Sequence, residues 1–343
     1  MTERTWQAFF IEEIFDILPG KRLTKAEMIP GDTPFIGASD SNNGVTAFVG
    51  NDNESADENF LSVSYNGSVC ECFYHPYRCL CSDDVKRFHL KNRAGNKYVY
   101  LFLATCIRRQ KDKYNYGYKF NETRMRRQKI MLPVTAEGAP DYDFMESYMR
   151  AKEEKILQRY RDFVSIADAA QVPPLKEKTW RAFFIGEIFD VIQRGKRLKT
   201  ADHLQGDKPY VSSSAQNNGV DNFIGNDKNV RTFEDCLTIA NSGSVGKTFY
   251  HKYEFIASDH VTALSSPRLN KYHYLFLAAQ LNKLSEKYSF NREITDARIR
   301  RERLMLPVND AGEPDFEYME AFVKNKMAAQ YRKYLEYIGG DDE

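Results

Sequence analysis

The hydrophobic and polar positions of this chain follow one pattern twice. Each half opens with an apolar and aromatic segment, at 6–18 and again from Trp180. Short apolar segments follow, separated by Gly, Asn, Asp and Pro, and this punctuation is typical of hairpins and irregular β structure. The predicted strands are 33–38, 45–49, 60–65 and 69–74 in the first half, and 209–213, 220–224, 236–240 and 245–250 in the second.

Two kinds of helix complete each half. Segments 98–110 and 272–284 carry apolar residues on all sides, which predicts buried helices. Segments 141–164 and 315–338 contain no Gly or Pro and repeat apolar residues at spacings of three and four, which predicts long amphipathic helices. Because each long helix offers only a narrow apolar stripe, we expect the two to pair with each other rather than to pack along their own domains.

The repeat is a duplication of a whole domain. Segments 5–16 and 179–190 are near copies 174 residues apart, as Trp6 and Trp180 show. Later blocks keep the register: Gly20-Lys21-Arg22-Leu23 matches Gly195-Lys196-Arg197-Leu198. A period this long excludes a solenoid, whose units have about 20–50 residues. We expect an α/β (α+β) protein with globular units at 1–140 and 179–314, helices at 141–167 and 315–343, and a linker at 168–178.

Composition narrows the class of protein. The 343 residues are enough for two cores, and 42% hydrophobic with 28% charged residues excludes a disordered chain. The longest apolar run, 98–107, is about half as long as a membrane span. Because the first residues lack the pattern of a signal peptide, we expect a cytoplasmic protein without a membrane segment, whose six cysteines are thiols.

The charges balance overall but cluster locally. The formal net charge is +1, from 49 basic and 48 acidic residues. Basic clusters occur at 21–22, 108–113, 124–129, 194–199 and 298–303. Local basic faces can still attract a polyanion, because screening confines charge effects to about 10 Å. Since several clusters occur in both halves, they favour a shared role over ordinary solvated surface charge.

Two motifs imitate chemical sites. Segment 241–248 resembles a phosphate-binding loop, but it has Asn241 where that motif needs Gly, and a strand rather than a helix is expected after it. Cys70, Cys72, Cys79 and Cys81 could form a thiolate quartet, yet the second half has Gly246, Thr248, Phe255 and Ala257 there. Buried thiols are therefore favoured over zinc. With no catalytic constellation, we expect a chain that is not an enzyme and binds no metal.

The remaining candidates are turn residues suited to contacts with DNA. Basic residues after a glycine suit phosphate or guanine contacts, and they are Lys21, Arg22, Lys196 and Arg197. Paired asparagines are either turn residues or readers of adenine, and they are Asn42, Asn43, Asn217 and Asn218. Small or basic donors beside open backbone are Asn66, Ser68, Ser242, Ser244 and Lys247.

Blocks 60–69 and 235–246, with 82–85 and 258–261, carry a family resemblance that extends over both halves. The chain resembles the DNA-specificity subunit of Type I restriction–modification enzymes, and most closely the compact specificity (beta) subunit of Type IIB restriction enzymes. The resemblance implies two target-recognition domains, 1–140 and 179–314, whose spacer helices pair as an antiparallel coiled coil. It also implies double-stranded DNA with a bipartite target as ligand, and a methyltransferase/endonuclease subunit as partner. S-adenosylmethionine and Mg²⁺ would belong to that partner, with no cofactor in this chain.

Two other functions remain compatible with the sequence. A protein-interaction scaffold would use the duplicated domains to bind protein, and a duplicated enzyme would modify or cut DNA by itself. The specificity-subunit interpretation makes a geometric prediction. Helices of 24 residues are about 36 Å long, close to one turn of B-DNA, so the half-sites should lie about one turn apart.

Overall fold

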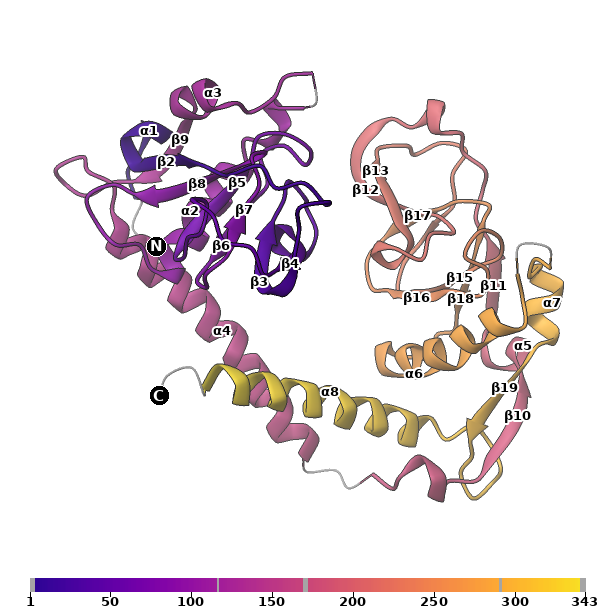
Figure 1. Cartoon of the computed structure of the whole chain (residues 1–343). Helices are drawn as coiled ribbons and strands as arrows, with labels where there is room; N and C mark the ends of the chain where they lie inside the picture. The colour runs from indigo at the N-terminus through magenta and orange to yellow at the C-terminus, as the bar shows by residue number, and fades with distance from the viewer. Residues whose placement is uncertain (1–3, 116, 169–171, 290–291, 340–343) are drawn as a thin grey trace. The chain divides into compact units, whose positions relative to one another are not determined.

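The chain forms two compact units, 1–157 and 158–343, with the boundary inside a long helix. A computed structural model of the whole chain (Figure 1) describes residues 4–115, 117–168, 172–289 and 292–339. The two units are built from the same series of elements, as the duplicated pattern predicts.

The first unit contains a four-stranded sheet of order β2-β8-β5-β6, a three-stranded sheet of order β4-β3-β7, and the antiparallel pair β1-β9. Its elements are β1 (Trp6–Phe10), α1 (Ile11–Ile14), β2 (Phe15–Pro19), β3 (Pro30–Ile36), η1 (Asn42–Gly44), β4 (Val45–Val49), β5 (Phe60–Ser64), β6 (Cys72–His75), β7 (Leu80–Cys81), β8 (Val85–Leu90), α2 (Lys97–Arg108), η2 (Lys111–Lys113), α3 (Glu122–Arg127), β9 (Lys129–Pro133) and α4 (Tyr142–Asp168).

The second unit repeats this order with small changes. Its sheets are β11-β18-β15-β16, β13-β12-β17-β14 and β10-β19. Its elements are η3 (Leu175–Glu177), β10 (Trp180–Phe184), α5 (Ile185–Ile188), β11 (Val191–Arg194), η4 (Thr200–Asp202), β12 (Gln205–Val211), η5 (Asn217–Gly219), β13 (Val220–Ile224), β14 (Thr232–Phe233), β15 (Cys236–Ala240), β16 (Thr248–His251), β17 (Phe255–Ala257), β18 (Val261–Ser265), α6 (Lys271–Leu281), η6 (Asn282–Glu286), α7 (Asp296–Arg301), β19 (Arg303–Pro307) and α8 (Phe316–Gly339).

The buried helices α2 and α6 organise the two main cores. Six residues of each are buried, and each packs against its four-stranded sheet, as the all-round apolar pattern predicts. Asn96 caps α2 by accepting hydrogen bonds from the main-chain N–H groups of Tyr98 and Val99, and Asn270 caps α6 in the same way. The sequence prediction extended both helices too far, because α2 ends at Arg108, and a 3₁₀ turn follows α6 from Asn282.

Both long helices are present, and each apolar stripe makes two kinds of contact: with the core of its own domain and with the other long helix. At the start of α4, Met145 is fully buried in the core of the first unit, and at the start of α8, Met319 is fully buried in that of the second. Within the second unit, the end of α4 contacts α8: the ring of Tyr160 stacks on that of Tyr331, with centroids 4.4 Å apart. The prediction of pairing instead of packing against the domains was therefore wrong for the first turns of each helix.

The strands β4, β13 and β15 have the predicted bounds, but two predicted strands begin too early. Segments 69–74 and 245–250 were predicted as strands, whereas β6 starts at Cys72 and β16 at Thr248. The reason is local: Cys70 has φ 65° and Gly246 has φ 82°, and this left-handed backbone belongs to a turn. The strand after 241–247 agrees with the rejection of a phosphate-binding loop.

Among the residues that the structure describes, no helix is long and apolar enough to cross a membrane. The same residues contain no group of three or more His, Cys, Asp or Glu side chains placed to hold a metal ion. Cys70, Cys72, Cys79 and Cys81 are all buried free thiols. Burial raises the pKa of the Cys70 thiol to about 12, so this thiol stays protonated at neutral pH.

Candidate nucleic-acid interface

Four loops of the first unit are joined by main-chain hydrogen bonds. We call them the Lys-Arg turn (20–23), the Asn-Asn turn (37–44), the Gly-Ser turn (65–71) and the β7–β8 turn (82–84). The β7–β8 turn and the strand before it contact the Lys-Arg turn, the Gly-Ser turn and the end of β3 that leads into the Asn-Asn turn. The joining bonds, from N to O, are Lys21 to Cys81 (2.8 Å), Ser82 to Ile36 (2.8 Å), Tyr65 to Asp84 (3.1 Å) and Ser68 to Ala38 (3.1 Å).

The second unit has the same four loops and the same connections. The corresponding segments are 195–198, 212–219, 241–247 and 258–260. The corresponding bonds are Lys196 to Ala257 (3.0 Å), Ser258 to Val211 (2.9 Å), Asn241 to His260 (3.0 Å) and Ser244 to Ser213 (3.1 Å). The predicted contact residues, which are scattered along each half of the sequence, therefore lie on four connected loops in each domain.

The sequence explains why these loops take this shape. A side chain at Gly20 would place its Cβ 2.0 Å from the carbonyl oxygen of Ser82, and one at Gly195 would come within 2.2 Å of Ser258. Only glycine permits such an approach of the Lys-Arg turn to the β7–β8 turn. Asn43 and Asn218 have φ 52° and 54°, a left-handed backbone that asparagine tolerates better than most residues. The turn role expected for the paired asparagines is confirmed, and a contact with adenine stays a prediction.

The four predicted basic residues are exposed and only weakly engaged. Lys21 lies 3.0 Å from Glu54 and Arg22 lies 3.4 Å from Asp83, and exposed ion pairs of this kind contribute little. Lys196 donates to the side chain of Asn229 at 3.3 Å. Arg197 makes no hydrogen bond or ion pair with other described residues. All four basic groups remain accessible to an anionic ligand.

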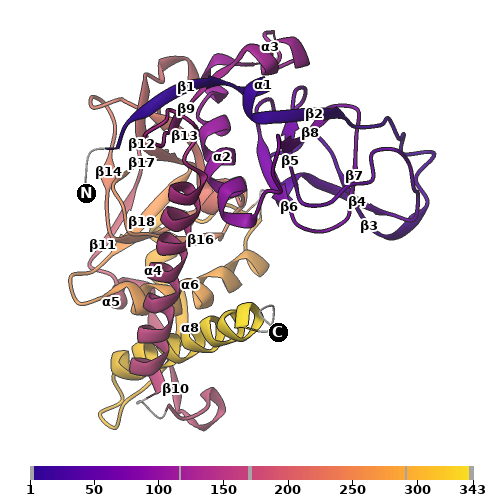
Figure 2. The ribbon, with the colours of Figure 1, turned by 90° about the vertical axis from the view of Figure 1, so that its left-hand side faces the viewer.

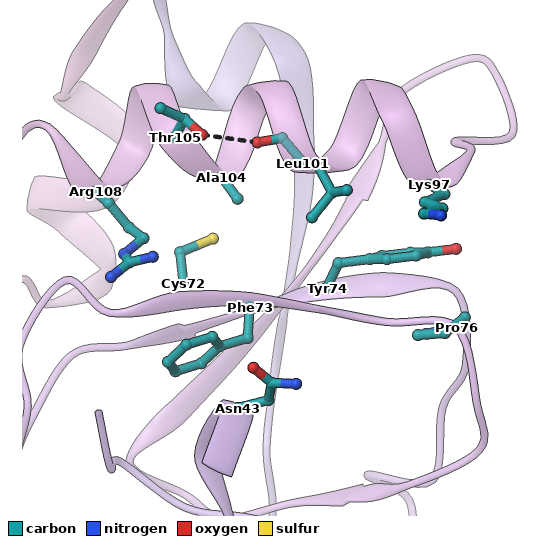
Figure 3. A pocket seen from close by; sticks show the side chains of 10 residues that line it. All are labelled: Asn43, Cys72, Phe73, Tyr74, Pro76, Lys97, Leu101, Ala104, Thr105 and Arg108. Carbon is teal, nitrogen blue, oxygen red and sulfur yellow. Dashed lines mark hydrogen bonds between the residues drawn. The ribbon is translucent and has the colours of Figure 1, made fainter. Parts of the chain in front are cut away.

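The asparagines and small donors differ in accessibility. Asn42, Asn217 and Asn218 are exposed, and so is Asn43, which borders a cavity of about 380 Å³ between β6 and α2. Figure 3 shows Asn43 and Phe73 across this cavity from the α2 side chains Leu101 and Arg108. The cavity lies beside the Asn-Asn turn and continues the polar loop surface toward a basic side chain.

The Gly-Ser turns present different groups in the two domains. In the first, the Asn66 side chain donates to Asp84 at 3.0 Å, and Ser68 is half-buried. In the second, Ser242 is buried and its hydroxyl lies 2.5 Å from Nδ1 of His260, while Ser244 is half-buried. His260 itself is exposed and is the outermost polar group of that pair. The expectation that Ser242 is an open donor is therefore modified, because this exposed imidazole lies over it.

A charge reversal follows directly after the Gly-Ser turn. Glu71 is buried and paired with Arg108 at 3.1 Å and also with Lys111. The matching residue of the second domain is Lys247, which is exposed, and the position of Arg108 is taken by Asn282. The two loop sets thus carry different donors and acceptors on one backbone framework. Different base edges require such different sets.

Sequence reasoning noticed the basic segments 124–129 and 298–303 but did not assign them to the site. In the first domain, α3 is attached to the loops through Lys86, whose ammonium lies 2.9 Å from Glu122 and over the ring of Tyr65. In the second, the Thr262 hydroxyl donates to Asp296 of α7 at 2.8 Å. The recurrence of Arg-x-Arg-Arg in both halves was the available signal.

One arginine of each short helix is exposed and makes no ion pair with the described residues. Arg127 on α3 and Arg301 on α7 occupy the same position in the repeat, and both are exposed. Neither makes a hydrogen bond or ion pair with the other residues that the structure describes. Their neighbours are engaged, since Arg126 pairs with Glu122 at 2.7 Å. Each domain therefore combines polar loops with an unpaired arginine on an adjoining helix.

Comparison with known proteins agrees with this duplicated arrangement. The description "Type I restriction modification DNA specificity domain" matches residues 3–159 and again 177–336. The chain is therefore built from two DNA specificity domains in tandem. Because these matches cover most of its length, the chain belongs to the family of Type I restriction–modification DNA specificity proteins.

Two relatives are specificity subunits. The Type II restriction enzyme specificity subunit S.BcgI of Heyndrickxia coagulans is 56% identical over 159 residues, which are 46% of this chain and 47% of that protein. The alignment thus spans about half the length of that relative. A putative type I specificity subunit of Mycoplasma pneumoniae is 22% identical over 320 residues, 88% of this chain and 85% of that one.

One solved structure aligns with nearly the full length of this chain. The crystal structure of a Type I restriction–modification S subunit from M. genitalium aligns with 99% of this chain and 94% of its own, at 15% identity and a TM-score of 0.47.

Proposed function

We propose that this chain is the sequence-specific DNA-recognition subunit of a restriction–modification system. Each domain reads one half of a bipartite target, and the chain docks a methyltransferase/endonuclease subunit that performs the chemistry. The observation that carries the proposal is the pair of equivalent loop sets, which share main-chain connections but present different side chains. A reader of two unlike half-sites needs this combination.

The roles divide between the loops and the short basic helices. Exposed arginines hold phosphates and so set the register on the duplex, and we assign this to Arg127 and Arg301. Polar loop groups read base edges, and we assign this to the Asn-Asn and Gly-Ser turns with His260 and Lys247. Lys21, Arg22, Lys196 and Arg197 extend the phosphate contacts, because a lysine or arginine beside a tight glycine turn can approach the backbone of DNA closely.

The first test is the salt dependence of DNA binding. Changing both Arg127 and Arg301 to Ala removes two phosphate contacts, and each contact contributes about 0.9 to the slope of log K against log salt. The slope should therefore fall by about 2, with weaker binding to all sequences alike. The measurement is fluorescence anisotropy of the complete complex on a duplex that carries the methylated target.

The matched control is Lys155→Ala, at an exposed position of α4, a helix that lies apart from α3 in both views (Figures 1 and 2). It removes one positive charge and should leave affinity and slope unchanged. If the affinity of the wild type and of the variants does not depend on salt concentration, the chain would instead be a protein-interaction scaffold.

The length of α4 and α8 should set the spacing of the half-sites. Four residues inserted into each helix add about 6 Å, roughly one turn. In α4, we place the insertion after Ile156, because that side chain is 47% exposed and separates the turns packed on the first domain from those that contact α8. The preferred gap should lengthen while the half-sites stay the same, as mapping of modified sites across a host genome will show. A target with one continuous motif would contradict the bipartite proposal.

A further inference from the structure

Asp84 and His260 occupy equivalent positions, at the end of the β7–β8 turn and of its counterpart in the second domain. The carbonyl oxygen of Asp84 accepts a hydrogen bond from the main-chain N–H of Tyr65 at 3.1 Å. That of His260 accepts one from the main-chain N–H of Asn241 at 3.0 Å. The backbone therefore holds both residues in the same way against the Gly-Ser turn of their own domain. Only the side chains differ, a carboxylate in one domain and an imidazole in the other.

Each of these side chains is held by one residue of the neighbouring Gly-Ser turn. The side-chain N–H of Asn66 donates to the carboxylate of Asp84 at 3.0 Å, and the hydroxyl of Ser242 lies 2.5 Å from Nδ1 of His260. Asn66 and Ser242 are equivalent, because each directly precedes the glycine of its turn, with φ 61° in the first domain and 59° in the second. The two positions thus differ together between the domains, Asn with Asp in one and Ser with His in the other. In both, the inner side chain orients the outer one.

Asp84 offers only hydrogen-bond acceptors. An ionised carboxylate has about four lone-pair sites and no donor. Asn66 donates to one of its oxygens, and the hydroxyl of Tyr65 is a second donor, whose pKa is raised by burial and by the charge of Asp84. Acceptor capacity remains on this half-buried carboxylate. Beside a polyanion a carboxylate is repelled unless the ligand gives it a hydrogen bond, and on base edges the amino groups of cytosine and adenine are donors.

His260 offers a hydrogen-bond donor. Its side chain is 59% exposed, and because Nδ1 is the nitrogen beside Ser242, Nε2 is the ring nitrogen left for a ligand. The carboxylate of Asp259 lies 3.9 Å from Nε2, which favours the tautomer with the proton on Nε2. The Ser242 hydroxyl then donates to Nδ1. An Nε2–H group matches the exocyclic oxygen of guanine or thymine, which accepts hydrogen bonds in the major groove.

We propose that positions 84 and 260 select bases by opposite hydrogen-bonding chemistry. Asp84 accepts from the amino group of a cytosine or adenine in one half-site, and His260 donates to the exocyclic oxygen of a guanine or thymine in the other. Asn66 and Ser242 are positioning residues, because they act through the side chains that touch the base. The inference rests on the proposed function and deepens it, since it names the class of base that each domain prefers at one position.

The test measures the base preferences of the complete complex with its methyltransferase/endonuclease partner. The complex selects duplexes from a random library, and sequencing of the bound fraction gives both half-sites. Ser242→Asn together with His260→Asp gives the second domain the residue pair of the first. One position that prefers guanine or thymine should then prefer cytosine or adenine, with a change of about tenfold in relative affinity, as expected for one base contact. The other half-site should stay the same.

The reciprocal exchange and a matched control complete the set. Asn66→Ser together with Asp84→His should change one cytosine or adenine position of the other half-site into a guanine or thymine position. Asp32→Asn is the control, because it neutralises an exposed carboxylate of β3 that lies outside the four loops. It should leave both half-sites unchanged. Unchanged half-sites in both exchanges, or the same change with the control, would overturn the inference.

Base analogues test the same contacts in the wild-type chain, so that a variant that fails to fold does not decide the outcome. Replacing cytosine by 2-pyrimidinone or adenine by purine removes the amino group, and 2-aminopurine in place of guanine or 5-methyl-2-pyrimidinone in place of thymine removes the oxygen. One such replacement in each half-site should weaken binding about tenfold. Asp84→Asn should abolish the sensitivity to the amino group, and His260→Ala the sensitivity to the oxygen.

The outcomes separate this inference from the proposed function. If the complex selects a bipartite target but neither variant changes the response to the analogues, the assignment of positions 84 and 260 fails and the proposed function stands. If the complex selects no sequence at all, the proposed function fails, and the inference fails with it.

Discussion

The two domains fill the same interior position in opposite ways. In the first, the buried guanidinium of Arg87 lies 2.7 Å from Asp57, and the ring of His89 lies 2.8 Å from the same carboxylate. In the second, the residues that correspond to this trio are Phe233, Ala263 and Ser265, and the ring of Phe233 packs against that of Phe255 at 6.0 Å. A polar network and an aromatic cluster thus support the same pair of sheets.

This difference shows which features the fold needs and which it merely tolerates. A buried ion pair gains little over apolar residues of similar volume, since desolvation of the charges offsets their attraction. Either filling can therefore stabilise the sheets. What the position requires is complete filling and complete satisfaction of its polar groups. Removing one member of either arrangement should therefore lower the free energy of unfolding. Exchanging the whole polar network for the whole aromatic cluster should change it far less.

The largest effect should come from the aromatic cluster. Phe255→Ala leaves a cavity at a fully buried position, and we expect the second domain to lose about 4 kcal/mol of unfolding free energy. The matching change in the first domain, Cys79→Ala, removes only one sulfur atom and should cost about 1 kcal/mol. Hydrogen exchange of each domain in the full chain measures both. Equal losses would show that the larger aromatic side chain adds no packing stability at this position.

Disrupting the polar network should lower the free energy of unfolding somewhat less than disrupting the aromatic cluster. Arg87→Ala leaves Asp57 partly buried without its main partner, and we expect the first domain to lose about 3 kcal/mol. Arg78→Ala is the control, because the exposed pair of Arg78 with Asp52 at 2.8 Å should contribute less than about 1 kcal/mol. A loss for Arg87→Ala no larger than the control's would show that the network is not structural.

The smallest predicted effect concerns a buried histidine that is present in both domains. Burial lowers the pKa of His75 and of His251 to about 4, below the ordinary value of 6.5. Between those values the unfolded chain binds more protons than the folded one, so stability is full above pH 6.5 and falls as the pH drops toward 4. Each histidine should lower the free energy of unfolding by about 2 kcal/mol at pH 5 relative to pH 8.

The variants test this pH dependence one domain at a time. Because His75 Nε2 lies 2.8 Å from the Ser62 hydroxyl, His75→Gln keeps a hydrogen-bonding group there while removing the titration. It should flatten the pH dependence of the first domain only, and His251→Gln that of the second only. Urea unfolding of the full chain, followed by hydrogen exchange in each domain, gives the two slopes. An unchanged slope would assign the acid sensitivity to other groups.

Much of the fold could be predicted because the duplication shows the sequence pattern of each element twice. Strands such as β4 and β13 have the predicted bounds, since punctuation by Gly, Asn and Pro marks both copies. The failures lie where tertiary contacts decide. The periodicity of α4 predicts an apolar stripe, but not that Met145 enters the core of its domain while Tyr160 meets Tyr331. Periodicity shows which face is apolar and does not name the surface that covers it.

The candidate site divides in the same way. The turn residues could be found from Gly and Asn, because left-handed backbone restricts the choice of residue at Asn43 and Gly44. The part played by α3 could not, since the ion pair of Lys86 with Glu122 joins segments 36 positions apart. Nor could the covering of Ser242 by His260, which depends on how two loops meet.

The main-chain bonds that join the four loops have an evolutionary consequence. Each of those bonds, such as Ser68 N to Ala38 O, involves atoms that every residue except proline possesses. A mutation that alters an exposed side chain on these loops therefore leaves the framework intact. Substitutions at exposed positions of these loops can therefore change the groups that the loops present while the protein stays folded at every step. Glu71 and Lys247 show that the same turn framework holds even opposite charges at one position, one buried and ion-paired and the other exposed.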